Sequence, residues 1–83
     1  MKITVKYFAS IRETIGVGSE SVTTSATTLA ALRDELVARG GSHALALARG
    51  KTVRMALNQT MADEAVALVD GAEVAFFPPV TGG

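Results

Sequence analysis

The chain has 83 residues, a length that suits one domain with a single modest hydrophobic core. Hydrophobic residues make up 48% and charged residues 19% of the chain, as in a folded globular protein rather than a disordered one. Eight basic and eight acidic side chains cancel and form no basic patch, so we expect neither nucleic acid nor a membrane as a partner.

The first third of the chain predicts two strands separated by a short helix. Residues 2–8 alternate between apolar and polar side chains, which indicates a strand with one buried face. A helical segment over residues 10–15 runs to a glycine-containing turn at 16–18. The β-branched run at 20–24 predicts a second strand, paired with the first as a hairpin.

The middle of the chain predicts one main helix and one short helix. A threonine at 27–28 is expected to cap the main helix, and the glycines at 40–41 are expected to end it. Its leucines repeat at helical spacing and indicate core packing, whereas the charged residues 33–35 are expected to face largely away from the core. Ser42 is expected to cap the second helix, which stops near Gly50.

The last third predicts two more strands. Residues 53–58 alternate again and indicate a third strand, followed by a turn at 58–60. Residues 62–69 are expected to form a variable segment that crosses the domain. An Asp-Gly turn signal at 70–71 precedes the last strand, which we expect over residues 73–77.

This order of strand, strand, helix, strand and strand predicts an α+β fold. The main helix can cover one face of a mixed sheet, in the two-layer arrangement of a β-grasp domain. The first and last strands are expected to lie side by side in the centre of the sheet. We expect the β-grasp domain to span residues 1–78 and a flexible C-terminal tail to span residues 79–83.

Two phenylalanines fall on the wrong faces of their strands. Phe8 follows the polar face of the first strand, and Phe77 lies opposite the face shared by Val74 and Phe76. If both strands keep their alternation, these rings point away from the helix-covered core. We predict that Phe8 and Phe77, extended by Met61, form an interface with a partner protein. The alternative is that a bulge or strand end returns the rings to the core.

The chain ends in two glycines preceded by two prolines. Gly82 and Gly83 have no Cβ, so this end can enter a channel that is too narrow for any side chain. Pro78 and Pro79 end the preceding strand and favour an extended exit. We predict an arm that runs through Thr81 to a reactive carboxylate on Gly83; ordinary fraying of a terminus is the alternative.

The sequence contains no cysteine, which excludes disulfides, thiolate catalysis and cysteine-based zinc sites. The single histidine, His43, cannot build a metal site and is expected on the surface of a short helix. No catalytic constellation or phosphate-binding glycine loop is visible, so we expect no catalytic residue, no metal and no bound cofactor. No apolar run suits a transmembrane helix or a signal peptide, and we expect a cytoplasmic location.

The sequence resembles the small subunits of molybdopterin synthase, which are sulfur carriers with a ubiquitin-like β-grasp fold. The most specific match is the block DGAEVAFFPPVTGG at residues 70–83. The thiamine-pathway sulfur carriers share the fold and the two glycines but generally lack the Phe-Phe-Pro-Pro-Val stretch. Departures from the pattern lie in the loops at 16–19 and 62–69. The other matching stretches are residues 7–9, 12–13, 29–33, 44–47 and 58–60.

The resemblance implies a reaction cycle carried by Gly83. An E1-like adenylating enzyme uses ATP to adenylate the Gly83 carboxylate, and sulfur from a persulfide donor replaces AMP to give a thiocarboxylate. The carrier then docks into the large catalytic subunit of molybdopterin synthase, in a heterotetramer, and sulfur passes to cyclic pyranopterin monophosphate to form the dithiolene. The resemblance also implies that Phe8, Met61 and Phe77 contact the partners, and that the catalytic side chains belong to the partners.

Two other functions use the same activation step and stay open at this point. One is a ubiquitin-like modifier that is joined to target lysines through Gly83. The other is a sulfur carrier for thiamine, cysteine or another pathway. The C-terminal glycines do not distinguish these fates, because each of them begins with adenylation of the same carboxylate.

Overall fold

The computed structural model describes residues 1–79, and residues 80–83 lie outside the described part. Within residues 1–79, five strands and three helices follow one another. Their bounds are β1 Lys2–Tyr7, α1 Ala9–Ile15, β2 Ser19–Thr23, α2 Leu29–Ala38, α3 Gly41–Leu47, β3 Arg54–Leu57, β4 Thr60–Ala62 and β5 Glu73–Phe77.

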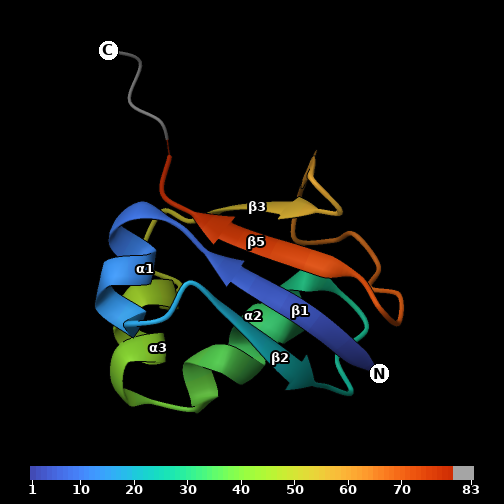
Figure 1. Cartoon of the computed structure of the whole chain (residues 1–83), viewed down its shortest axis with the longest axis horizontal. Coiled ribbons are helices and arrows are strands. Elements are labelled where there is room, and N and C mark those ends of the chain that lie inside the picture. Colours follow the sequence, from blue (N-terminus) through green and yellow to red (C-terminus); the bar gives the residue numbers. More distant parts are fainter. Residues whose placement is uncertain (80–83) are drawn as a thin grey trace.

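The strands form one mixed sheet in the order β2-β1-β5-β3-β4. The first and last strands, β1 and β5, are parallel neighbours in its interior, as predicted, and the other pairs are antiparallel. The helices lie against one face of this sheet (Figure 1). The architecture is therefore the predicted α+β fold with one covered face.

The core lies between the sheet and α2. Alternate residues of β1 and β5 are buried, and the predicted leucine stripe of α2 covers them. The side chains that share this core and are at most 2% exposed include Ile3, Val5, Tyr7, Leu29, Leu32, Leu36, Leu47, Val74 and Phe76. The alternate residues of the strands and the regularly spaced leucines of α2 thus pack together in one cluster.

The helix ends agree with the prediction at α2 and differ from it at α3. Thr28 caps α2, and its hydroxyl accepts a hydrogen bond from the backbone N–H of Ala31 at 3.2 Å. The prediction that Ser42 caps α3 was wrong, because this helix begins at Gly41 and Ser42 is already inside it. Gly40 and Gly41 have positive φ angles of 74° and 55°, so a tight glycine turn starts the helix in place of a side-chain cap.

The strand β4 lies in a region that was expected to be a turn and a variable segment, and it was not predicted. Asn58 and Gln59 both have positive φ angles, 49° and 68°, which is the conformation of a two-residue type I′ hairpin turn. Leu57 pairs with Thr60 directly across this turn. A three-residue edge strand is too short to show alternation, and glutamine is an unusual residue at a left-handed position.

The charged residues 33–35 do not all face solvent, contrary to the prediction. Residues 34 and 35 are exposed, whereas Arg33 is buried with 5% of its surface exposed. A buried charge needs a full set of polar partners, and here they come from segments that follow α2. The guanidinium of Arg33 donates hydrogen bonds to Leu47 O at 2.7 Å, Ala48 O at 2.9 Å, Lys51 O at 3.0 Å and Glu64 Oε1 at 2.9 Å.

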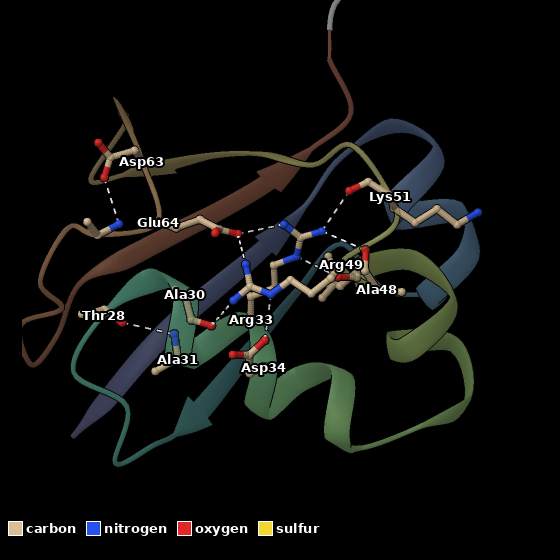
Figure 2. A network of polar contacts seen from close by, with 12 residues as sticks. Thr28, Ala30, Ala31, Arg33, Asp34, Ala48, Arg49, Lys51, Asp63 and Glu64 are labelled. Carbon is tan, nitrogen blue, oxygen red and sulfur yellow. Dashed lines mark hydrogen bonds and ion pairs between the residues drawn. The ribbon is translucent and has the colours of Figure 1, made fainter.

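A second arginine, Arg49, binds the same carboxylate, that of Glu64 (Figure 2). It also lies 3.0 Å from Asp34 Oδ1. The hydrogen bond from Arg49, together with the one from Arg33, outweighs partial burial and lowers the pKa of Glu64. The Arg49 side chain is 45% exposed, so solvent screens its ion pairs and we expect them to stabilise the fold less than the bonds of Arg33 do.

His43 is not a simple surface residue, contrary to the prediction, because its side chain is only 18% exposed. Its Nε2 lies 2.8 Å from Glu20 Oε2, which also accepts a hydrogen bond from the Tyr7 hydroxyl at 2.7 Å. Arg39 donates to the other carboxylate oxygen at 2.8 Å. Burial raises the pKa of Glu20, but the hydrogen bonds from these three side chains outweigh burial and hold its pKa at about 2. This cluster ties the edge strand β2 to the helices.

Candidate docking face and tail exit

The face of the sheet opposite the core presents a row of side chains across four strands. Lys6 of β1 pairs with Ala75 of β5, Ala75 with Ala56 of β3, and Ala56 with Met61 of β4. Cross-strand partners point to the same side, and the next row, which contains Phe76, is buried in the core. We call this side of the sheet the open face. Its two central alanines are small, so another protein can approach the backbone closely there.

The predicted interface residues all lie on or beside the open face. Phe8 is 47% and Met61 is 60% exposed, and Phe77 is partly buried. The backbone N–H of Phe8 donates to the carbonyl of Phe76 at 3.1 Å, which continues the β1–β5 ladder by one step and brings Phe8 level with Phe77. Met61 lies two strands away from β5, beyond β3. Their role as a partner interface stays a prediction.

The C-terminal tail leaves the sheet from an interior strand. β5 ends at Phe77, and Pro78 and Pro79 follow outside regular structure because proline has no N–H to continue the ladder. This end of β5 lies on the same side of the molecule as α1, away from the N-terminus (Figure 1). The predicted tail residues Thr81, Gly82 and Gly83 lie outside the described residues.

A sequence comparison places the chain in a family. The sequence model of the ThiS family matches residues 5–83. The chain is a member of the ThiS family. It is 46% identical to the molybdopterin synthase sulfur carrier subunit of Escherichia coli K12 over 81 residues, which cover 98% of this chain and 99% of that relative.

Solved structures show the same fold in other organisms. SAMP1 from Haloferax volcanii superposes with a TM-score of 0.78 at 27% identity, with both chains fully covered. In the complex of subunits 1 and 2 of molybdopterin-converting factor from Helicobacter pylori, the matching chain has a TM-score of 0.69 at 30% identity, again with both chains fully covered. The ubiquitin-like β-grasp fold of this ThiS-family chain is therefore shared over its whole length.

Two cations lie close to the tail exit of this ThiS-family protein, and the sequence analysis did not single them out. Arg54 of β3 is exposed and pairs in register with Phe77 on the open face. Lys51 is exposed in the loop before β3 and lines a groove of about 220 Å³ whose wall includes Pro78. Alternation with Ala56 was the signal that could have placed Arg54 on the open face.

The groove lies between α1, α3 and the start of β3. Its apolar lining includes Ile11 and Ala46, which are nearly buried, and Leu45, which is 67% exposed. The exposed leucine was not distinguished from Leu47 in the sequence, because two apolar residues in one short helix give no clear period. The groove thus adds a second surface, of mixed polar and apolar character, beside the root of the tail.

The described residues contain no group of three or more His, Asp or Glu side chains that could hold a metal ion. Among residues 1–79, no helix has both the length and the apolar character needed to cross a membrane.

Proposed function

We propose that this chain is the sulfur carrier subunit of a molybdopterin synthase and that it carries sulfur as a thiocarboxylate on Gly83. The observation that supports this best is its 46% identity with a molybdopterin synthase sulfur carrier subunit over 98% of this chain. The family match also runs through the last residue, Gly83. We further propose a cytoplasmic location, as expected from the sequence.

The proposed chemistry explains why the carrier needs a free C-terminus and no cysteine. A carboxylate is a poor electrophile, so an adenylating enzyme transfers AMP from ATP to the Gly83 carboxylate and releases pyrophosphate. The terminal sulfur of a persulfide attacks this carbonyl, a C–S bond forms and AMP leaves. A second thiol then cleaves the S–S bond and releases the thiocarboxylate. ATP is consumed on the partner enzyme, and the carrier itself holds no cofactor.

The open face supports a docking role in this cycle. Phe8 and Met61 are exposed and Phe77 is partly buried, and together they offer apolar surface around two small alanines, which suits burial against a partner. We propose that the same face meets the adenylating enzyme and then the large catalytic subunit, with two carriers and two large subunits in a heterotetramer. The catalytic side chains for sulfur transfer are proposed to lie on the large subunit. A related complex is that of subunits 1 and 2 of molybdopterin-converting factor from Helicobacter pylori.

The experiment that tests the proposal uses the absence of cysteine in the chain. The protein is incubated with ATP, its adenylating enzyme and a persulfide donor, treated with a thiol alkylator, and its intact mass is recorded. Alkylation that requires both ATP and Gly83 is the expected result, with the Gly83 deletion as the matched control. No alkylation, with the enzyme shown to work on a known carrier, contradicts the proposal. Alkylation is essential because oxidation of a methionine adds nearly the same mass as exchange of oxygen for sulfur.

A second candidate function is a ubiquitin-like modifier. It is favoured by the likeness to SAMP1, which belongs to the small archaeal modifier proteins, at a TM-score of 0.78 and 27% identity. Lysine-linked adducts in cell extract are expected for a modifier, and accumulated precursor pterin in a deletion strain is expected for the carrier. Rescue of the deletion by a thiazole supplement, without a defect in molybdoenzymes, points instead to a thiamine-pathway carrier.

A further inference from the structure

The charges of this neutral chain are not paired evenly. Within residues 1–79, four basic side chains form an ion pair with an acidic one, namely Lys6, Arg33, Arg39 and Arg49. Lys51 and Arg54 are exposed and have no ion pair among the described residues. Lys2 and Arg12 likewise form no ion pair among the described residues. Lys51 and Arg54 both flank the point at which the chain leaves the sheet.

Arg54 lies on the open face directly beside Phe77. The two residues are register partners in the β3–β5 ladder, so their side chains stand next to each other on one side of the sheet. Of the other charged side chains near this part of the face, Lys6 and Glu73 pair with each other at 3.4 Å, and the exposed Asp63 lines the same hollow as Arg54 without an ion pair to it among the described residues. Any protein that covers Phe77 must also cover or border the guanidinium of Arg54, which has no ion pair among the described residues.

Lys51 stands on the other side of the tail exit. Its backbone is fixed, because its carbonyl accepts from Arg33 at 3.0 Å and its N–H donates to Ala48 O at 2.8 Å. Its side chain points away from the arginine network (Figure 2). Lys51 and Pro78 line the same groove, so a protein that surrounds the root of the tail also meets the ammonium group.

An unpaired charge that is covered by a partner loses hydration and is costly unless an opposite charge meets it. We propose that Lys51 and Arg54 form a basic collar around the tail exit, and that the large synthase subunit presents acidic side chains at the mouth of the channel that receives the tail. The inference rests on the proposed function, which makes the large subunit the tail's destination. The attraction between these acidic side chains and the two cations of the carrier then sets the orientation in which the tail enters.

The test compares charge reversals at matched net charge. The variants Arg54→Glu and Lys51→Glu are compared with Lys2→Glu. Lys2 is exposed, has no ion pair among the described residues, and lies at the start of β1, far from the tail exit. Affinity for the large subunit from the same organism is measured by calorimetry, with circular dichroism as a check of folding. We expect each collar variant to weaken binding about tenfold and Lys2→Glu to change it less than about twofold.

Salt gives an independent readout of the same contact. Binding of the wild type is expected to weaken between about 0.05 M and about 0.5 M salt, and binding of the doubly reversed Lys51→Glu, Arg54→Glu variant is expected to change less. An equal loss for Lys2→Glu would show that only net charge matters, and unchanged binding of both collar variants would also overturn the collar. If the wild type receives no sulfur and does not bind the large subunit, the proposed function is rejected, and the proposed collar is rejected with it.

Discussion

Replacement of Arg33 by alanine is the substitution for which the fold makes the sharpest stability prediction. The side chain donates four hydrogen bonds, three of them to backbone carbonyls, one at the end of α3 and two in the connection between α3 and β3. Arg33→Ala leaves Leu47 O without a donor in a region that water does not reach, since Leu47 itself is 0% exposed. The acceptors on Ala48 and Lys51 lie nearer the surface and can regain water.

The expected magnitude follows from these three acceptors. An unsatisfied buried carbonyl costs about 1–3 kcal/mol, and each hydrogen bond near the surface that is exchanged for one to water costs about 0.5–1.5 kcal/mol, the value for an ordinary hydrogen bond. With the lost packing of the side chain, Arg33→Ala should destabilise the protein by about 3–5 kcal/mol. A domain of this size has about 4–12 kcal/mol in total, so the variant should melt at least about 12 °C lower than the wild type.

The assay is urea unfolding at neutral pH, followed by circular dichroism. Arg49→Ala is the matched control, because it removes the same charge from the same carboxylate of Glu64 but from a side chain that is 45% exposed. The control should lose no more than about 1 kcal/mol. Equal losses for the two variants would refute the argument from burial. If Arg33→Ala does not fold, Arg33→Lys, which keeps the charge but not the fork of donors, should still fold and lose more stability than the control.

Three further predictions concern the chain end, the open face and pH. Deletion of Gly83 should abolish thiocarboxylate formation and leave the melting temperature unchanged; sulfur transfer by the shortened chain contradicts the tail mechanism. Phe77→Asp should weaken partner binding at least about tenfold with little unfolding, whereas Phe76→Ala, in the core, should cost about 3–5 kcal/mol of stability; a similar stability loss at Phe77 would show that its ring belongs to the core. Glu20 has a pKa of about 2 in the fold against an ordinary value of 4.5, so its contribution of at most about 3 kcal/mol is complete above pH 4.5 and is lost as the pH falls towards 2. Urea unfolding across this range should therefore show a weaker pH dependence in Glu20→Gln than in the wild type, and equal slopes would contradict it.

Much of the fold was predictable because buried side chains recur with the period of the strand or helix that carries them. The alternation in β1 and β5 and the leucine spacing in α2 identified the core face, and β1 and β5 are adjacent as expected. The same alternation put Phe8 and Phe77 on the other side of the sheet from Tyr7 and Phe76. These features depend only on local geometry, which a single sequence records.

The features that were missed depend on contacts between distant segments. The partners of Arg33 lie 14 to 31 residues further along the chain, so no local pattern distinguishes this arginine from its exposed neighbours. His43 is drawn inward by Glu20, 23 residues earlier. The strand β4 exists because Asn58 and Gln59 adopt left-handed conformations and return the chain against β3. In each case tertiary structure overrides a local preference.

The strand that leads to the tail is an interior strand of the sheet. β5 pairs with β1 on one side and with β3 on the other, so both edges of the strand are hydrogen bonded up to Phe77. A slip of one residue in either ladder would exchange Phe76 with Phe77, so core packing also fixes the side chains that face a partner. A partner that binds the chain end therefore binds next to an interior strand, and the core already determines the register of that strand. This separation of a buried face from an open face explains why substitutions on the open face should change binding, while those on the covered face should change stability.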